Sequence, residues 1–378
     1  MTSSKQADLD AAAETTMRIR QRQIARILVL WLPFLAWTAW RPWPTSAQIL
    51  ACVAWACFLT CHIVVGERYW IWHIPALMPP FTLAAVSLVL AAAALGMRGA
   101  ATGPALVLAA SSLVAGWPEN GLNLAPLIHP RSSIPPGETI RIVAWNTQYW
   151  YTGTSGPDCF YQYLASLGAD VYLLQEYIVA TGNGTFRELD DDQRLRAAFP
   201  DYHVAIKGQL VTISRLPIKS QPFVGSTEVS RVDLGTETAG HVLSTYNVHI
   251  PVQVPPMRPA NGYLRELCRR SRERQAHVAM LVSDLRANRA PTVVAGDFNA
   301  TSLTGDLRPL RRCAVDAARS GGPLYPVSWH AGRWWLSMWR LDWMFLRGGV
   351  TARRYRLARP GVRSDHRVQI VNLRIPNV

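Results

Sequence analysis

Long apolar stretches with very few charges dominate the first third of the chain. Four of them lie between residues 25 and 117, near positions 27–40, 47–66, 70–97 and 101–116. Stretches approaching about 20 apolar residues favour helices that cross a bilayer, because its hydrocarbon core is about 30 Å thick. We therefore predict a membrane anchor of three or four transmembrane helices over residues 25–117. A buried helical domain of a soluble protein is the alternative.

Prolines and stretch lengths limit how the four apolar stretches can be interpreted. Pro79 and Pro80 either kink the third stretch or mark where its helix begins. A cleavable signal peptide does not fit, because one apolar core of about 7–15 residues would be enough and no processing site follows the first stretch. The first and fourth stretches are short for a bilayer, so the number of spans stays open between three and four.

The residues on either side of the anchor predict its orientation. Residues 1–24 form a polar tail, and four arginines precede the first stretch: Arg18, Arg20, Arg22 and Arg26. The positive-inside tendency places this end in the cytoplasm, so three spans would put the rest of the chain outside and four would put it inside. Residues 118–138 form a Pro-rich linker with a single Arg, which favours the outside. We expect a multi-pass protein of the cell membrane with an extracytoplasmic C-terminal part.

From residue 139 the pattern changes to strand-like runs that alternate with amphipathic helical segments. The strand-like runs are IRIVAW, ADVYLL, HVLSTYNVHI, PTVVAG, LDWMFL and HRVQIVNL. Residues 158–168 predict a short helix with Asp158 as its cap and Gly168 as its stop. Residues 263–288 predict a longer helix with one apolar face, formed by Leu264, Leu267, Val278, Leu281 and Leu285. The alternation predicts an α/β domain over residues 139–378.

Short polar motifs stand at the ends of these strand-like runs. They are WNTQ at 145–148, LQEY at 174–177, NVHI at 247–250, GDFN at 296–299, LDWMF at 341–345 and SDH at 364–366. A rigid sheet would hold such polar groups together at its strand ends and adjoining loops. Carboxylates, amides and two histidines are the inventory of a divalent-metal phosphoester hydrolase.

In their order and spacing these motifs resemble the endonuclease/exonuclease/phosphatase superfamily, which includes the deoxyribonuclease-I-like nucleases. The resemblance covers residues 139–378, and six motifs in the family's order are far more specific than GDFN alone. It implies a four-layer α/β sandwich, in which two packed mixed sheets are flanked by helices. It also implies a metal-dependent phosphoric ester hydrolase with Mg²⁺ or Mn²⁺ as its cofactor. The mostly oxygen ligands speak against zinc.

The resemblance assigns three residues to the metal. Glu176 corresponds to the principal metal ligand, and a cation gives a physical reason for a carboxylate at the end of an apolar strand. Asn146 matches the Asn that supports the metal or its water, and Asp365 matches a further metal-binding residue. Taken alone, Glu176 could point into solvent and Asn146 could be a turn residue.

Five further residues are predicted to be catalytic. By resemblance, Asp297 orients or deprotonates the attacking water, and Asn299 hydrogen-bonds that water and the phosphate. His366 is a general base or a phosphate contact, and Asp342 holds its tautomer and favours its charged form. His249 binds phosphate or assists the leaving oxygen. The alternative for His249 is a histidine at the core edge that bonds only to the backbone.

Charge and cysteines add less. The formal net charge is +14, and +11 of it lies after residue 138, where 30 Lys and Arg face 19 Asp and Glu. Such a surface attracts polyanions or an anionic membrane. Only three of the 39 basic residues are Lys, so the same balance can reflect genomic base composition. The six cysteines contain no CxxC pair, and one bridge among Cys159, Cys268 and Cys313 stays open.

The favoured function is hydrolysis of a phosphoester or pyrophosphate, with a lipid pyrophosphate carrier as a concrete candidate because the enzyme is tethered to a membrane. The runner-up is a membrane-tethered nuclease, favoured by the basic balance. Tyr177 stands where nucleases of this group often have Arg, and no Pro follows His366. Both departures leave the catalytic set intact but weaken a specific deoxyribonuclease assignment. A third possibility is an inactive binding or scaffold protein. The expected partners are a phosphorylated substrate, lipid-linked or nucleic acid, and the bilayer, and no protein partner is indicated.

Overall fold

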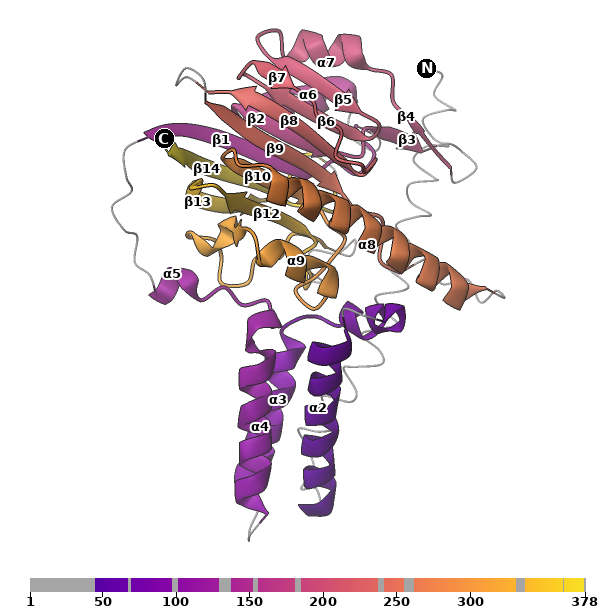
Figure 1. Cartoon of the computed structure of the whole chain (residues 1–378), viewed down its shortest axis with the longest axis vertical. Helices are drawn as coiled ribbons and strands as arrows, with labels where there is room; N and C mark the ends of the chain where they lie inside the picture. Colours follow the sequence, from indigo (N-terminus) through magenta and orange to yellow (C-terminus); the bar gives the residue numbers. More distant parts are fainter. Residues whose placement is uncertain are drawn as a thin grey trace.

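The computed structural model describes residues 45–66, 69–96, 101–128, 137–151, 156–180, 185–236, 241–254, 262–330, 337–362 and 364–376. The predicted polar tail at 1–24 and the first apolar stretch at 27–40 lie outside these residues. Within them, a bundle of helices extends as a stalk from a domain built on two sheets (Figure 1).

The bundle contains three helices that follow the second, third and fourth apolar stretches. They are α2 (Thr45–Val65), α3 (Thr82–Leu95) and α4 (Thr102–Gly116). By length and composition, α2 can cross a membrane. A second candidate span is Trp70–Leu77 together with α3, a pair bent by 66°. The chain runs along the bundle towards the sheets in α2, away in α3 and back in α4 (Figure 1).

Pro79 and Pro80 mark the start of α3, as one of the two sequence alternatives expects. Two 3₁₀ turns precede them, η1 (Trp70–His73) and η2 (Pro75–Leu77). The carbonyl of Pro79 then accepts hydrogen bonds from the Thr82 amide at 3.0 Å and the Thr82 hydroxyl at 2.6 Å. Because proline has no N–H to continue a helix, the third apolar stretch divides into short turns and a 14-residue helix.

The first sheet has six strands in the order β13-β14-β1-β2-β6-β5. Their bounds are β1 (Gly137–Asn146), β2 (Val171–Gln175), β5 (His203–Lys207), β6 (Leu210–Ser214), β13 (Thr351–Ala358) and β14 (Val368–Pro376). Strands β1 and β2 are parallel, and β14 is antiparallel to β1. The ends of β1 and β2 therefore meet the start of β14 at one edge of the sheet.

The second sheet repeats this arrangement in the order β11-β12-β10-β9-β8-β7. Its strands are β7 (Ile218–Ser220), β8 (Val229–Gly235), β9 (Val242–His249), β10 (Thr292–Asp297), β11 (Val315–Asp316) and β12 (Asp342–Arg347). Strands β9 and β10 are parallel, and β12 is antiparallel to β10. A separate pair, β3 (Ile178–Ala180) and β4 (Phe186–Glu188), follows β2.

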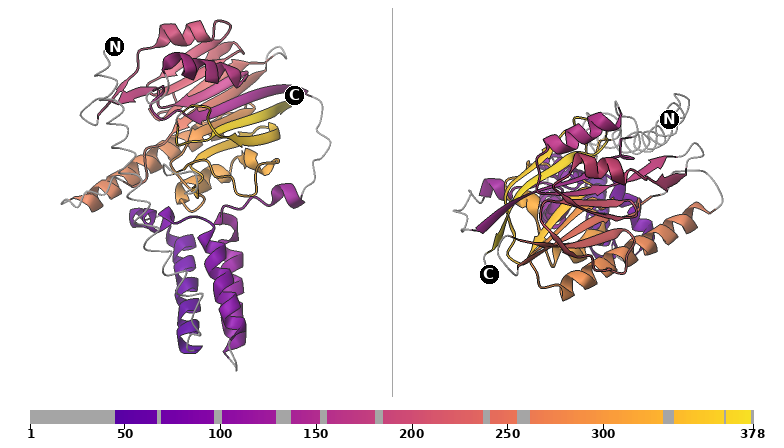
Figure 2. Two further views of the ribbon diagram at one scale, coloured as in Figure 1. Left: turned by 180° about the vertical axis from the view of Figure 1, so that it is seen from behind. Right: turned by 90° about the horizontal axis from the view of Figure 1, so that it is seen from above.

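Three buried clusters separate four layers. One fills the space between the two sheets, with Ile142 and Leu173 from the first and Val293 and Met344 from the second. The second cluster lies between the first sheet and α6 (Pro157–Ser166) with α7 (Asp192–Ala198). The third lies between the second sheet and α8 (Tyr263–Ala287) with α9 (Arg308–Arg311). Seen from above, α8 lies on the opposite side of the strands from α6 (Figure 2).

The elements agree with the sequence pattern except in detail. All six strand-like runs form strands, and both predicted helices form as α6 and α8. Asp158 lies in the first turn of α6, but the cap is Gly156 and no side chain caps the helix. Leu264, placed on the buried face of α8, is 56% exposed because it precedes the part of the helix that covers the sheet. All six cysteines are free thiols.

The bundle and the sheet domain meet through polar contacts as well as apolar ones. Glu119, in η3 (Trp117–Glu119), accepts from Arg308 at 2.9 Å and lies 2.7 Å from the His62 ring. The Trp339 indole donates to the carbonyl of Leu77 at 2.9 Å. The predicted linker is thus partly packed: its described part, up to α5 (Ala125–Ile128), includes Glu119 and further contacts to the sheet domain.

Candidate active site

All eight residues singled out in the sequence lie at the shared edge of the two sheets. Asn146 and His249 end β1 and β9, and Glu176 directly follows β2. Asp297 ends β10, opposite Asp342 at the start of β12. The remaining three are Asn299, Asp365 and His366. Their side chains share one network, and the roles assigned to them stay predictions.

Asn146 joins two buried carboxylates. Its amide Nδ2 donates to Glu176 Oε1 and to Asp297 Oδ2, each at 3.0 Å. The Nε2 atom of His249 faces the same two oxygens at 3.8 and 3.7 Å. Glu176 and Asp297 are 4% and 1% exposed, so two negative charges are held close together away from water. Such an arrangement is costly without a cation or a positively charged group nearby.

The backbone around these carboxylates adopts unusual conformations. Gln148, Tyr149 and Trp150 have positive φ in succession, and Glu176 and Asn299 also have positive φ. The turn at Tyr149 lets its amide donate to Glu176 Oε2 at 3.0 Å. Non-glycine residues reach this region only at a cost, and such strain is concentrated at functional sites.

His366 and Asp342 form a buried pair beside this group. His366 Nδ1 lies 2.8 Å from Asp342 Oδ2, and His366 Nε2 faces Asp297 Oδ2 and Asp365 Oδ1 at 3.7 Å each. Burial lowers the pKa of His366, but the carboxylates of Asp342, Asp297 and Asp365 outweigh it and raise that pKa to about 10. Burial also raises the pKa of Asp342, against the effect of the adjacent imidazolium.

Side chains that the sequence did not reveal hold the predicted ones in place. Gln209 Oε1 lies 2.9 Å from His249 Nδ1, and Gln209 Nε2 donates to Glu228 at 2.9 Å. The Trp329 indole donates to Asp365 Oδ2 at 2.9 Å, and Gln148 Oε1 accepts from the Asp365 amide at 2.9 Å. Gln148 belongs to the WNTQ motif at 145–148, whereas Gln209, Glu228 and Trp329 lie outside the six polar motifs and carry no signal in the sequence.

The donor set fits a divalent cation. Glu176, Asp297 and Asp365 supply buried carboxylate oxygens, the ligands that Mg²⁺ and Mn²⁺ prefer. By distance alone, single ligand atoms of Asp297, Asp342 and His366 lie within 4.8 Å of one another. In that second set, however, Asp342 and His366 already bond to each other. Glu176 and Asp365 do not belong to the group that the distances pick out among the described residues, so their role as metal ligands stays a prediction.

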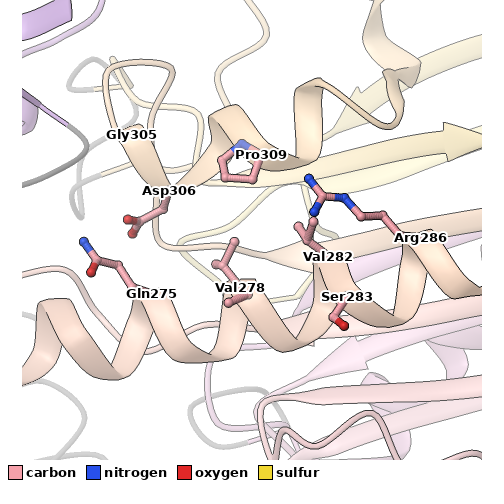
Figure 3. Close-up of a pocket in the computed structure, with 9 residues that line it drawn as sticks. Gln275, Val278, Val282, Ser283, Arg286, Gly305, Asp306 and Pro309 are labelled. Carbon is pink, nitrogen blue, oxygen red and sulfur yellow. The ribbon is translucent and has the colours of Figure 1, made fainter. Parts of the chain in front are cut away.

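A separate cavity lies on the outer face of the second sheet. It has a volume of about 400 Å³ between α8 and η4 (Gly305–Leu307) with α9 (Figure 3). Val278 and Val282 line it, and Asp306 at its wall pairs with buried Arg274 at 2.8 Å. Its lining includes none of the eight predicted residues, so it is distinct from the candidate active site.

Residues 143–366 match the model of the Endonuclease/Exonuclease/phosphatase family, and the match includes every motif of the site. The chain belongs to this family. Members of the family are phosphoester hydrolases, so the chain is a phosphoric ester hydrolase. The sequence has no significant match among curated proteins.

The chain is similar to several solved structures. An endonuclease/exonuclease/phosphatase from Bacteroides vulgatus is 15% identical with a TM-score of 0.46, covering 63% of this chain and 100% of its own. Truncated TDP2 from Caenorhabditis elegans is 13% identical with a TM-score of 0.44, covering 63% and 98%. The 3′ phosphatase NExo from Neisseria, bound to a product DNA hairpin, is 14% identical with a TM-score of 0.44, covering 61% and 98%.

Proposed function

We propose that the protein is a membrane-anchored, divalent-metal-dependent phosphoesterase that acts on a phosphoester or pyrophosphate at the bilayer surface. The observation that carries the proposal is that the loop after Asn299 rests on the helical bundle. Thr301 Oγ1 donates to the Ala76 carbonyl at 3.3 Å, and Ser302 Oγ donates to the Glu119 carbonyl at 2.5 Å. Because Thr301 follows Asn299 by only two residues, the candidate active site lies close to the end of the bundle that meets the sheets.

The surface of the bundle supports its place in a membrane. Large apolar side chains stand exposed along all three helices: Leu50, Val53, Ile63 and Val64 on α2, Leu88 and Leu95 on α3, and Val107 and Val114 on α4. Their exposures reach 74% at Val114. Soluble proteins rarely expose apolar surface over several helices, whereas lipid-facing helices do. We infer that residues 25–117 form the predicted anchor and that residues 139–378 form the catalytic domain.

The geometry supports distinct chemical roles. The chemistry expected of a bound divalent cation at Glu176 is charge neutralisation on the phosphoryl oxygens and activation of water. Asn299 is placed to position a nucleophile beside Asp297, since its backbone amide and its Nδ2 both bond to that carboxylate, at 2.8 and 3.3 Å. A charged His366 would donate to a phosphoryl oxygen, which favours the phosphate-contact role over the general-base role.

The substrate that best suits a site at the bilayer surface is a lipid pyrophosphate. Full-length protein in nanodiscs should release inorganic phosphate from a polyprenyl pyrophosphate in Mg²⁺, and EDTA should abolish the release. His366→Ala should abolish it as well, with Arg289→Gln, an exposed change far from the site, as the control. Failure on every polyprenyl substrate tested would count against this substrate class.

The second candidate is a membrane-tethered nuclease, and the net charge of +14 favours it. Nicking of plasmid DNA in Mg²⁺ that disappears in His366→Ala would support it over the lipid substrate. Binding should then weaken steeply with salt. An inactive scaffold predicts no turnover of either substrate and no effect of His366→Ala.

A further inference from the structure

Four arginines gather on the outer face of the first sheet, on three adjacent strands. Val143 and Trp145 of β1 pack under α6 on this face, so by strand alternation Arg141 points to the same side. Asn372 is the cross-strand neighbour of both Arg141 and Arg354. Arg356 and Arg374 follow at alternate positions on β13 and β14.

The helices of this layer leave that part of the sheet uncovered. The apolar cluster that α6 and α7 cover reaches β14 at Val368 and Ile370. Seen from behind, β13 and β14 lie open beside α6 (Figure 2). Arg354 and Arg356 are exposed and Arg141 is half-buried, whereas Arg374 is buried.

The cluster encloses a small pocket of about 140 Å³. Its lining is Arg141, Arg354, Arg356, Ile370 and Asn372. Three guanidinium groups and one amide in a recess of this size match the donors that a tetrahedral oxyanion requires. No carboxylate lines it.

The guanidinium groups are poorly paired within the described part of the chain. Among the residues that the structure describes, no carboxylate pairs with the side chains of these four arginines. The Nε atoms of Arg141 and Arg374 are buried and have no hydrogen-bond acceptor. Asp170, directly before β2, accepts from the backbone N–H of Arg141 at 2.8 Å, and its side chain pairs with Arg215. Clustered like charges and buried unpaired donors both cost free energy, and a bound anion would relieve both.

We propose that the pocket formed by Arg141, Arg354, Arg356 and Asn372 binds a phosphate group. Arg141 stands five positions before Asn146 on β1, or about 16 Å along an extended strand, so this site is separate from the catalytic one. The phosphate can belong to free inorganic phosphate, which phosphomonoester hydrolysis releases, or to the backbone of a nucleic acid. The proposal holds whichever substrate the catalytic site takes.

The test measures binding of two probes, inorganic phosphate and a short single-stranded DNA, to the full-length protein in EDTA, which removes metal-dependent binding at the catalytic site. The variant Arg354→Gln with Arg356→Gln should weaken binding of the recognised probe by at least about tenfold. These side chains are exposed on an edge strand, so the fold should persist. The control, Arg289→Gln with Arg312→Gln, removes the same charge from exposed positions elsewhere.

Each outcome decides the proposal. Selective loss of inorganic phosphate binding identifies a free anion as the ligand. Loss of DNA binding, with a salt slope reduced by about 0.7 per lost phosphate contact, identifies a nucleic acid backbone. Restored binding in Arg354→Lys with Arg356→Lys would show charge to be sufficient. Equal losses in the test and control variants, or no binding of either probe by the unmodified protein, would overturn the proposal.

Discussion

His366 lies among three carboxylates, and this position decides the charge of its ring. The Nδ1 atom contacts Asp342, and the Nε2 atom faces Asp297 and Asp365. With a pKa raised to about 10, the ring is an imidazolium at neutral pH in the absence of a cation. A ring in this state can donate to a phosphoryl oxygen but cannot take a proton from water.

Replacing Asp342 tests this account. The variant Asp342→Asn removes the closest carboxylate, so the pKa of His366 should fall well below 10, as read from an NMR titration of its ring protons in EDTA. In the unmodified protein, stabilisation by the charged ring is complete below about pH 6.5 and is lost as the pH rises through about 10. The variant should lose that alkaline dependence of its melting temperature. An unchanged pKa in the variant would contradict the assignment.

Glu176 is the predicted principal metal ligand, and replacing it tests that role. Glu176→Gln keeps the shape of the side chain but removes its charge, so Mn²⁺ affinity should drop and kcat/KM should fall by at least about 10²-fold. Titration of Mn²⁺ by calorimetry separates lost binding from lost chemistry. Glu188→Gln, an exposed change on β4, serves as the control. Unchanged Mn²⁺ affinity in Glu176→Gln would exclude this carboxylate as a ligand.

At the scale of elements, the site depends on the close approach of neighbouring strands, and Gly296 on β10 shows how close β9 lies. Gly296 has a φ of 144°, and a Cβ added there would lie 2.0 Å from the Val248 carbonyl of the neighbouring strand. Gly296→Ala should therefore lower the melting temperature strongly, beyond the about 1–3 kcal/mol expected of backbone strain alone. Gly103→Ala, where nothing lies within 4 Å, should be neutral or slightly stabilising. Similar melting temperatures in the two variants would contradict the close approach.

Trp339 joins the bundle to the site. Its indole bonds to Leu77, and its ring packs edge-on against Trp329, which bonds to Asp365. Trp339→Phe should lower kcat while the fold persists. Trp55→Phe loses an equivalent bond, to Ser87 at 2.9 Å, inside the bundle and should leave kcat unchanged. Equal effects of the two changes on kcat would argue against a link between bundle and site.

The sequence pattern predicts elements where periodicity is strong and misses them where it is not. Buried strands such as β10 read clearly because both of their faces are apolar. The edge strand β13 alternates arginines with inward residues such as Tyr355, so its segment lacks the apolar run that predicts the other strands. The motifs predict the eight site residues. Gln209 and Trp329 also reach the site, at His249 and Asp365. Their positions depend on strand register and loop geometry, which cannot be read from the residues around them in the sequence.

At the scale of the whole molecule, the direction of the helices fixes which ends share a side. The chain direction along α2, α3 and α4 puts the start of α2 at the end of the bundle far from the sheets (Figure 1). By length and composition α2 is a candidate span and Trp70–Leu77 with α3 a second, whereas α4 is not. If all three helices nevertheless cross a membrane, as proposed, topology reporters fused before Met1 and after Val378 should lie on opposite sides when residues 27–40 do not span it, and on the same side when they do. An external C-terminus would direct the search to lipid carriers and extracellular nucleic acid. A cytoplasmic one would favour a nuclease or a phosphoester of the inner leaflet.

The docking of Thr301 and Ser302 on the bundle has a kinetic consequence. If the bundle lies in a bilayer and the substrate is lipid-linked, as proposed, the catalytic edge is held near the bilayer surface and the substrate reaches it by lateral diffusion. Turnover should then saturate with the mole fraction of substrate in the membrane. Diluting the vesicles in buffer would leave the rate per enzyme unchanged, whereas adding inert lipid would slow it.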